Sequence, residues 1–454
     1  MAVSPARSIA FEILLRVERE DSYATELLHS VVKLSSRDHG LATELVMGVL
    51  RWQSLLDQGL AIASSQKIAR LDDEVRTALR LGLYQLQFLS RVPARAAIFE
   101  SVELVKAARK RSAASFVNAV LRAISKTLPE DALASIKTAP DLITLAQNAA
   151  HPTWLVERWI QRYGLETART ICIHDQTVPD TAVVIHDIDV HDVAVHDADA
   201  EAGLAAAGVQ LAPGALLRSA RRVLAGDVAA MPAYKAGRMF IQDEASQLVA
   251  LLVGRGENLL DCCAAPGGKT ASLAWRNPHA KIVATELHPH RARLLRNLHP
   301  LTNVQVVVAD ARRLPFSSPG RFDRVLADVP CSGTGTLARN PEIKWRLKAD
   351  DLYDLHLRQV AILKSALAHL AVGGRLVYST CSLEREENEA VVEAALDGAK
   401  QFKVIDLNRE MERLRLGNEL CWKDIDSLLT GPYLRTIPGV HPCGGFFAAM
   451  IERG

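Results

Sequence analysis

The stretch "NLLDCCAAPGGKTASLAW", residues 258–275, contains three patterns in succession. A short apolar run ends at Asp261, a turn of small residues follows, and apolar residues at helical spacing come after Gly268. This order predicts a β-strand, a tight loop and an α-helix. Small residues let backbone amides and a helix N-terminus come close to a ligand, so the loop is a candidate binding site.

Similar segments recur towards the C-terminus. Each contains a short strand, rich in β-branched residues, that ends at a polar residue: 281–298, 304–314, 322–331 and 373–382. Strands that alternate with helical segments predict an α/β fold with a parallel, doubly wound sheet. Ligands of such a sheet bind beyond the carboxyl ends of its strands. We therefore expect one rim of the sheet to carry the residues at these ends, namely Cys262, Glu286, Asp310, Asp328 and Thr380–Cys381.

The N-terminal part of the chain has a different pattern. From residue 5 to about residue 127, apolar residues recur at three- and four-residue spacing, which is typical of amphipathic helices. A mixed segment follows, in which a helical stretch precedes alternating apolar and polar residues. A chain of 454 residues is too long for a single core. We expect three domains: an all-α domain over 1–135, a small α/β connector over 146–235 and the sheet domain over 236–454.

The composition is that of an ordinary globular protein, with 49% hydrophobic and 23% charged residues. Because the net charge is only +2, a nucleic-acid site must be a local patch, for which the strip Lys106–Arg111 is a candidate. Such a strip is more often a solvated helix face. The start of the chain lacks a signal-peptide pattern, and no apolar run is long enough for a membrane span. The seven irregularly spaced cysteines indicate reduced thiols, so we expect a cytoplasmic protein without a membrane partner.

Three kinds of cofactor loop are compatible with small residues between a strand and a helix. A dinucleotide site needs G-x-G-x-x-G, which is absent, and a phosphate loop needs a glycine where Cys263 stands. An S-adenosylmethionine loop needs small residues to make room for the methionine part. In that case Glu286 binds the ribose hydroxyls and Asp310 the adenine edge. The alternative for each acid is that it only caps a helix. The loop residues concerned are Cys263, Ala264, Ala265, Pro266, Gly267, Gly268 and Lys269.

Two cysteines stand at strand ends about fifty residues apart, Cys331 and Cys381. Transfer of a methyl group to C5 of a pyrimidine requires a thiolate that adds to C6, because C5 alone is a weak nucleophile. Cys381 precedes "SLEREENE", which we expect to start a helix whose N-terminus favours a thiolate. Asp328 can hydrogen-bond the ring, and Cys331 can assist product release. The alternative for any single cysteine is an inert buried thiol.

Four motifs resemble the RNA cytosine-C5 methyltransferases of the NOL1/NOP2/Sun family: "LLDCCAAPGGKT", "ADVPCSGTGTLARNPEIKWR", "YSTCSLEREENE" and "IPGVHPCGGFFAAMIER". The N-terminal helices, from "ARSIAFEILLRV" to "ASFVNAVLRAI", resemble the RNA-binding NusB domain. The two resemblances together cover nearly the whole chain. They imply a Rossmann-like class I methyltransferase domain, with a mostly parallel sheet and an antiparallel C-terminal strand, behind an all-α NusB-like domain and a small α/β connector.

The same resemblance implies a function and roles for individual residues. The reaction would be C5 methylation of a cytosine in 16S ribosomal RNA, the RNA of the small ribosomal subunit, with S-adenosylmethionine as the methyl donor. Cys381 would be the nucleophile and Cys331 the residue that releases the product. Cys263–Lys269, Glu286, Asp310 and Asp328 would bind the cofactor. In DNA cytosine methyltransferases the nucleophile follows a proline, as Cys331 does, but the second cysteine favours an RNA enzyme.

Two parts of the chain depart from the family pattern. Gly444 stands where the closing motif usually has an Asp, and "TAVVIHDIDV" lacks the usual Arg–Asn pair, which puts RNA contacts from this part in doubt. His186, His191 and His196 are each followed by Asp. Their odd spacing places successive histidines on opposite faces of a strand, so we expect no metal site.

Two other functions remain open. One is a related methyltransferase that acts on transfer RNA, although its N-terminal module would then differ from a NusB-like bundle. The other is a non-catalytic RNA-binding or antitermination factor, which would have no use for two cysteines and the cofactor acids. A target base must be unpaired or flipped to reach the rim. The sequence leaves the exact nucleotide and the oligomeric state undetermined, and a monomer is the expectation.

Overall fold

The computed structural model describes residues 3–20, 22–31, 34–126, 131–185, 203–298 and 301–454. The chain divides into two structural units and passes three times from one to the other. The helical unit comprises Met1–Pro179 and Leu337–Leu347, and the sheet unit comprises Asp180–Thr336 and Lys348–Gly454. These borders differ from the three segments expected from the sequence, because residues 146–179 belong to the helical unit. The three-domain division therefore stays a prediction.

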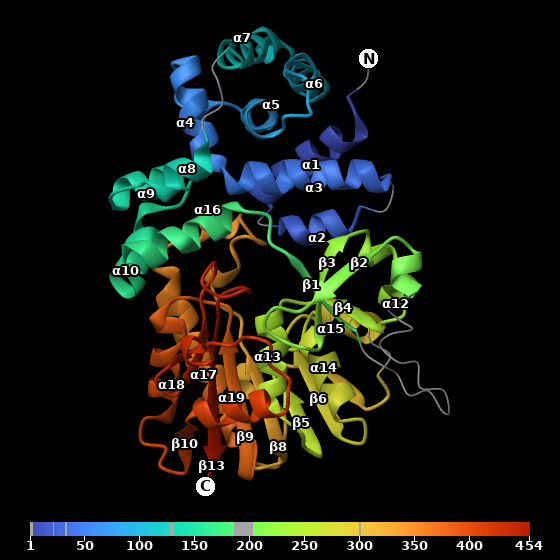
Figure 1. The fold of residues 1–454 in the computed structure, drawn as a ribbon, viewed down its shortest axis with the longest axis vertical. Helices are drawn as coiled ribbons and strands as arrows, with labels where there is room; N and C mark the ends of the chain where they lie inside the picture. Colours follow the sequence, from blue (N-terminus) through green and yellow to red (C-terminus); the bar gives the residue numbers. More distant parts are fainter. Residues whose placement is uncertain (1–2, 21, 32–33, 127–130, 186–202, 299–300) are drawn as a thin grey trace. The chain divides into compact units, whose positions relative to one another are not determined.

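The helical unit is built from amphipathic helices, as the sequence spacing predicts. Helix α1 (Pro5–Arg19), for example, buries Ala10, Ile13 and Leu14 along one side. The start of α3 is capped by Ser35, whose Oγ accepts the Asp38 N–H at 3.1 Å. The helices of the main N-terminal stretch are α1 (Pro5–Arg19), α2 (Ala24–His29), α3 (Ser36–Arg51), α4 (Gln53–Ser64), α5 (Asp73–Phe88), α6 (Ala94–Ala107), α7 (Ala114–Ile124), α8 (Ala132–Lys137), α9 (Leu142–Asn148) and α10 (Thr153–Gln176) (Figure 1).

The chain leaves the sheet unit at Leu337–Leu347, a segment that we call the excursion. This segment brings part of the "NPEIKWR" motif into the helical unit. Its short helix α16 (Ile343–Arg346) lies against the C-terminus of α3. The Trp345 indole donates to the Leu50 carbonyl at 2.7 Å, and the Lys344 ammonium donates to the Arg51 carbonyl at 2.8 Å. The last carbonyls of a helix have no partner within the helix. The excursion therefore supplies donors that α3 cannot supply itself.

The sheet unit begins with a small antiparallel sheet. Its strands are ordered β2 (Gln210–Pro213), β3 (Ala220–Ala225), β1 (Thr181–Ile185) and β4 (Met239–Ile241). The short helix α12 (Pro232–Lys235) precedes β4. The expected alternating strand is thus described over Thr181–Ile185, while His186, His191 and His196 lie outside the described residues.

The larger sheet of the described chain has nine strands and is mostly parallel. Strands β5, β6, β7, β8 and β9 are parallel to their neighbours, whereas the C-terminal strand β13 runs antiparallel to β9. The fold expected from the sequence and its resemblance is therefore confirmed. The path runs β11 (Leu429–Thr430), β12 (Tyr433–Thr436), β13 (Phe446–Arg453), β9 (Leu370–Thr380), β8 (Phe322–Asp328), β5 (Asn258–Asp261), β6 (Lys281–Glu286) and β7 (Val304–Val308), while β10 (Phe402–Ile405) pairs with β13 (Figure 1).

Successive residues of the central strands fill two hydrophobic cores, one on each face of this sheet. Leu259 packs in one core and Leu260 in the other, since neighbouring side chains of a strand point to opposite faces. Buried residues of α13 (Glu244–Val253), α14 (Gly268–Arg276) and α19 (Leu407–Leu416) belong to the first core. Those of α17 (Asp351–Ala368) and α18 (Glu389–Leu396) belong to the second. Helix α15 (Pro289–Leu298) contributes Leu295 to a smaller cluster beside β6.

Among the helices that the structure describes, none is both long enough and apolar enough to span a membrane.

Candidate active site

The carboxyl ends of the parallel strands deliver polar side chains to one rim of the sheet. Asp261 ends β5, Glu286 ends β6, Asp328 ends β8 and Thr380 ends β9, while Asp310 follows β7 by two residues. Strands that run in the same direction must end at the same edge. The rim expected from the sequence is therefore present, except that Cys262 is buried in the hydrophobic core and Asp261 stands at the end of β5.

The loop between β5 and α14 is held at both ends by one buried carboxylate. Asp261 accepts the Thr270 hydroxyl at 2.7 Å and the Cys263 N–H at 3.4 Å. Burial raises the pKa of Asp261 to about 6. Gly267 has a φ of 116°, which favours glycine, and α14 begins at the next residue. The small residues thus shape a tight turn with a helix start directly behind it.

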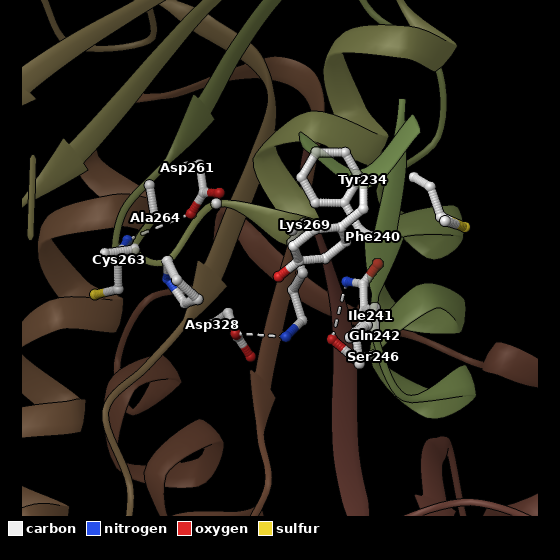
Figure 2. Close-up of a pocket in the computed structure, with 15 residues that line it drawn as sticks. Tyr234, Phe240, Ile241, Gln242, Ser246, Asp261, Cys263, Ala264, Lys269 and Asp328 are labelled. Carbon is white, nitrogen blue, oxygen red and sulfur yellow. Dashed lines mark hydrogen bonds and ion pairs between the residues drawn. The ribbon is translucent and has the colours of Figure 1, made fainter. Parts of the chain in front are cut away.

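A cavity of about 230 Å³ opens beside this loop (Figure 2). One wall is the loop itself, and the opposite wall comes from residues around β4 and the start of α13. The lining residues are Tyr234, Met239, Phe240, Ile241, Gln242, Ser246, Asp261, Cys263, Ala264, Ala265, Pro266, Gly267, Gly268, Lys269 and Asp328. All seven predicted loop residues and Asp328 therefore line one cavity, whereas Glu286, Asp310, Cys331 and Cys381 are not among its lining residues.

The cavity contains a buried hydrogen-bond acceptor that lacks a donor. The Gln242 side chain donates from Nε2 to the Ser246 hydroxyl at 3.1 Å, but its Oε1 atom has no partner in the described structure. Gln242 is only 8% exposed, so a ligand that brings an N–H group would satisfy an otherwise costly acceptor. S-adenosylmethionine has two amino groups, and the lining fits such a ligand.

Lys269 and Asp328 form an ion pair inside the cavity, with Nζ 2.7 Å from Oδ2 (Figure 2). The Ser379 hydroxyl donates to the other carboxylate oxygen at 2.7 Å. Burial acts against the ammonium, but the nearby Asp328, Cys381 and Asp261 outweigh it and raise the pKa of Lys269. Lys269 therefore stays charged in this site.

The two candidate cysteines meet at the rim, with 3.3 Å between the sulfur atoms of Cys331 and Cys381. Both are free thiols. The hydrogen bond to Cys381, together with burial, raises the pKa of Cys331 well above its usual value. Cys331 therefore retains its proton and can donate it towards the sulfur of Cys381. This arrangement suits Cys381 as the thiolate nucleophile and Cys331 as the protonated partner.

The helix expected to start within "SLEREENE" begins as a 3₁₀ turn, Arg385–Glu387, and α18 follows from Glu389. The backbone N–H groups of Leu383 and Glu384 instead donate to the hydroxyls of Thr334 and Ser382, at 2.9 Å and 3.0 Å. Side-chain acceptors of this kind replace helical hydrogen bonds locally. A role of this helix N-terminus towards the Cys381 thiolate therefore stays a prediction, and the Lys269 side chain is a nearby positive charge.

The sequence reasoning did not identify Glu387, whose buried carboxylate hydrogen-bonds to Ser332 and Ser382, the residues after the two cysteines. Its only sequence signal is its place in "SLEREENE". Three other glutamates of that stretch, Glu384, Glu386 and Glu389, look the same in the sequence.

The two remaining acids of the rim already have partners. Glu286 accepts the His288 N–H at 2.9 Å. Asp310 accepts the Arg312 N–H at 2.9 Å and pairs with the Arg312 guanidinium at 2.7 Å, and the pKa of Asp310 is lowered by this hydrogen bonding. Asp310 thus caps a short helical turn, which leaves its cofactor role a prediction.

A carboxylate also lies beside Gly444, where the family pattern has an Asp. Asp243 accepts the Gly444 N–H at 3.1 Å, and a Cβ atom at position 444 would lie 3.5 Å from the same oxygen. An Asp at 444 would therefore place a second carboxylate close to the first. Within the described residues, we find no group of His, Cys, Asp or Glu side chains arranged to hold a metal ion.

The sheet is Rossmann-like, its loop of small residues lies beside a cavity in which Gln242 lacks a hydrogen-bond donor, and two thiols lie close together. These features are those of the class of S-adenosylmethionine-dependent methyltransferases. Family models agree: residues 248–452 match the 16S rRNA methyltransferase RsmB/F family, and residues 4–126 match the NusB family.

Similar proteins extend this agreement over the full length. A protein from Bacillus subtilis, named probable ribosomal RNA small subunit methyltransferase B, is 35% identical over 100% of both chains. Ribosomal RNA small subunit methyltransferase B of Pseudomonas putida is 34% identical over 83% of this chain and 85% of its own. The crystal structure of PH0851 shares the fold over 100% of both chains, with a TM-score of 0.80 and 22% identity.

The chain belongs to the RsmB/F family of RNA methyltransferases. As a member of this family, it uses S-adenosylmethionine as its methyl donor.

Proposed function

We propose that this protein methylates C5 of a cytosine in 16S ribosomal RNA through a covalent bond between Cys381 and C6 of the base. The observation that carries the proposal is the pair of reduced cysteine sulfurs 3.3 Å apart, on the same rim as the Lys269–Asp328 ion pair. Methylation of oxygen or exocyclic nitrogen would have no use for two thiols. The names of the relatives support small-subunit ribosomal RNA as the substrate.

The chain's own residues account for each step on the base. The Cys381 thiolate forms a bond to C6, and the electrons of the C5–C6 double bond move to C5, which becomes nucleophilic. Asp328 and Lys269 hold the polar edge of the ring, where charge accumulates during the addition. After methylation, water accepts the C5 proton, the C5–C6 double bond re-forms, and Cys381 departs with the electrons of the C6–S bond. Cys331 assists this elimination by donating its proton to the departing sulfur.

S-adenosylmethionine supplies an electrophilic methyl group when it is bound. Cys263–Lys269 would surround its methionine part, with Gln242 as an acceptor for an amino group. Glu286 would accept the ribose hydroxyls, and Asp310 would bind the adenine edge. For Asp310 to do so, its carboxylate must share its acceptor sites with Arg312.

The target cytosine must leave its stack to reach the rim, and the NusB-like helices would hold the surrounding RNA. We propose that the protein acts as a monomer in the cytoplasm, where ribosomal RNA is present.

Transfer of labelled methyl groups from S-adenosylmethionine to isolated 16S RNA tests the function, with the modified base located by its resistance to bisulfite. One resistant cytosine in 16S RNA is the expected result, with no label on transfer RNA. Label on transfer RNA alone, or on 16S RNA at a position that bisulfite still converts, would contradict the proposal.

A further inference from the structure

One carboxylate connects the two cysteine loops. Glu387 is 0% exposed and lies at the end of a 3₁₀ turn, Arg385–Glu387. Its Oε1 accepts the Ser332 backbone N–H at 2.8 Å and the Gln359 amide at 2.9 Å. Its Oε2 accepts the Ser382 hydroxyl at 2.5 Å and the Ser332 hydroxyl. Both oxygens of the buried carboxylate are therefore occupied.

The groups bound by Glu387 are adjacent to the two thiols in the sequence. Ser332 directly follows Cys331, and Ser382 directly follows Cys381. Gln359 of α17 donates both to Glu387 and to the carbonyl of Pro330, which precedes Cys331. The Cys331 loop is thus held on both sides of the cysteine, and the Cys381 loop on one. We call Glu387 with these hydrogen bonds the clamp. Hydrogen bonds to an ionised group are about twice as strong as neutral ones, so the clamp holds the two cysteine loops firmly.

Glu387 also brings negative charge towards Cys331. Two titratable groups act on the pKa of Cys331, namely Cys381 after β9 and Glu387 in the 3₁₀ turn. Cys331 in turn contributes to the raised pKa of the buried Tyr378 in β9. The hydrogen bond to Cys381 and burial raise the pKa of Cys331 most, and the charge of Glu387 adds to them. Removing that charge should make the Cys331 thiol easier to ionise.

We propose that Glu387 is a positioning residue, which holds the Cys331 and Cys381 sulfurs at contact distance and keeps Cys331 in the protonated form. It touches the reacting base through neither oxygen, because both oxygens are bonded to the cysteine loops. The proposal rests on the two-cysteine function above.

The first experiment needs neither RNA nor cofactor. Glu387→Gln keeps the shape of the side chain but removes its charge, and serine hydroxyls can reverse their donor role towards an amide. Iodoacetamide labelling of Cys331 is measured against pH, with the site identified by mass spectrometry. We expect the labelling midpoint of Cys331 to fall by about one pH unit in Glu387→Gln. Glu393→Gln, an exposed acid on α18, should leave the midpoint unchanged. An unchanged midpoint in Glu387→Gln would overturn the electrostatic role.

The second experiment separates the two arms of the clamp and stays informative if Glu387→Gln fails to fold. Ser332→Ala removes a hydroxyl from the Cys331 loop, so release should slow and the covalent RNA adduct should accumulate about tenfold. Ser382→Ala removes the arm of the Cys381 loop, so adduct formation should slow by a similar factor without accumulation. If both variants lose methyl-transfer activity equally, and in proportion to their loss of thermal stability, the role of Glu387 is purely structural. If Cys331→Ala forms no adduct, the proposed function fails, while the labelling experiment still tests Glu387.

Discussion

At the scale of single residues, burial and neighbouring charge decide which groups of the rim carry protons. Lys269 is buried, yet its carboxylate and thiol neighbours raise its pKa, so it remains an ammonium. A hydrogen bond to Cys381 and burial raise the pKa of Cys331, so Cys331 remains a thiol. The Cys381 sulfur, which must become nucleophilic, thus has the Lys269 ammonium nearby and the protonated Cys331 thiol in contact with it. That division of roles leads to two predictions at this scale.

The two thiols should fail in different ways when removed. Cys381→Ala should abolish both methyl transfer and any covalent RNA adduct, because no bond to C6 can form. Cys331→Ala should still form the adduct but release it slowly, which leaves a protein–RNA band on denaturing gels. Cys421→Ala changes a free cysteine that follows none of the parallel strands, so it serves as the control and should behave as the unaltered enzyme. A stable adduct in Cys381→Ala would reverse the assignment and make Cys331 the nucleophile.

Truncation of Asp310 should lower the affinity for S-adenosylmethionine if the Asp310 carboxylate binds the adenine. Asp310→Ala then weakens S-adenosylmethionine binding about tenfold, the effect of losing one hydrogen bond to a charged group. Calorimetry with S-adenosylmethionine measures the change. Arg312→Gln is the matched control, since it removes the partner of Asp310 but leaves the acceptor in place. If Asp310→Ala binds the cofactor normally and only melts earlier, the acid is a helix cap and nothing more.

At the scale of elements, the excursion Leu337–Leu347 fastens a methyltransferase motif into the helical unit. Lys344 is 2% exposed there and shares its surroundings with His151 and Asp175, which form a buried contact of 3.2 Å. The His151 Nδ1 lies 2.7 Å from the Ala149 carbonyl, which can only accept. Nδ1 therefore carries the proton, and the other ring nitrogen accepts from a protonated Asp175. Burial raises the pKa of Asp175 to about 8 and lowers that of Lys344 to about 7, so the cluster is close to neutral.

The raised pKa of Asp175 should make the helical unit less stable as pH rises. Between about pH 4 and about pH 8, the unfolded chain releases the Asp175 proton while the folded chain keeps it, so the free energy of unfolding falls with pH. Asp175→Asn cannot release a proton. Its stability relative to the unaltered protein should therefore rise with pH, by at most about 1.4 kcal/mol per unit. Urea unfolding, monitored by hydrogen exchange of the α10 backbone amides, measures this difference in the free energy of unfolding.

Glu166→Gln makes the same change from acid to amide at an exposed position of the same helix. Its stability relative to the unaltered protein should not vary with pH. A flat difference for Asp175→Asn as well would mean that Asp175 is ionised in the folded protein.

At the scale of the whole molecule, the net charge of +2 means that RNA must be held by local patches. The strip Lys106–Arg111 is less open than the sequence indicates, because Lys106 pairs with Glu103 and Lys110 with Asp72, each at 2.8 Å. Arg109 and Arg111 are exposed and have no ion pair among the described residues. These two arginines are therefore the strip's free positive charges.

Neutralising both arginines should weaken RNA binding and its dependence on salt. Arg109 has a φ of 63°, which asparagine tolerates, so the suitable variant is Arg109→Asn with Arg111→Gln. If each arginine contacts one phosphate, the slope of log affinity against log salt should fall by about 1 to 2. Titration with 16S RNA at several salt concentrations measures this slope. Cofactor affinity should not change.

Arg37→Gln with Arg91→Gln removes the same charge from other exposed positions of the helical unit. This control should keep the original slope. Equal slopes in all three proteins would mean that the strip is a solvated helix face.

The amino-acid sequence alone was enough to predict the class of fold, the course of the central strands and part of the candidate site. Periodicity marks the amphipathic helices and the strands, since each depends on residues within one element. The cofactor loop and the two cysteine motifs are also local, because their residue types are needed at one turn. Cys263–Lys269 and Asp328 could therefore be assigned to one site before any coordinates were known, and they line one cavity.

Only the tertiary structure decided which distant groups touch. The contact between Cys331 and Cys381, the burial of Glu387 between their loops and the insertion of Lys344 into the helical unit all join residues far apart in the chain. Contacts between loops also set where the helix after Cys381 starts, because the hydroxyls of Thr334 and Ser382 accept the backbone N–H groups of Leu383 and Glu384. Such contacts depend on how strands and loops close on one another, and nothing in the local sequence distinguishes Glu387 from the glutamates beside it. Their distances and proton positions follow from packing, and packing belongs to the folded chain as a whole.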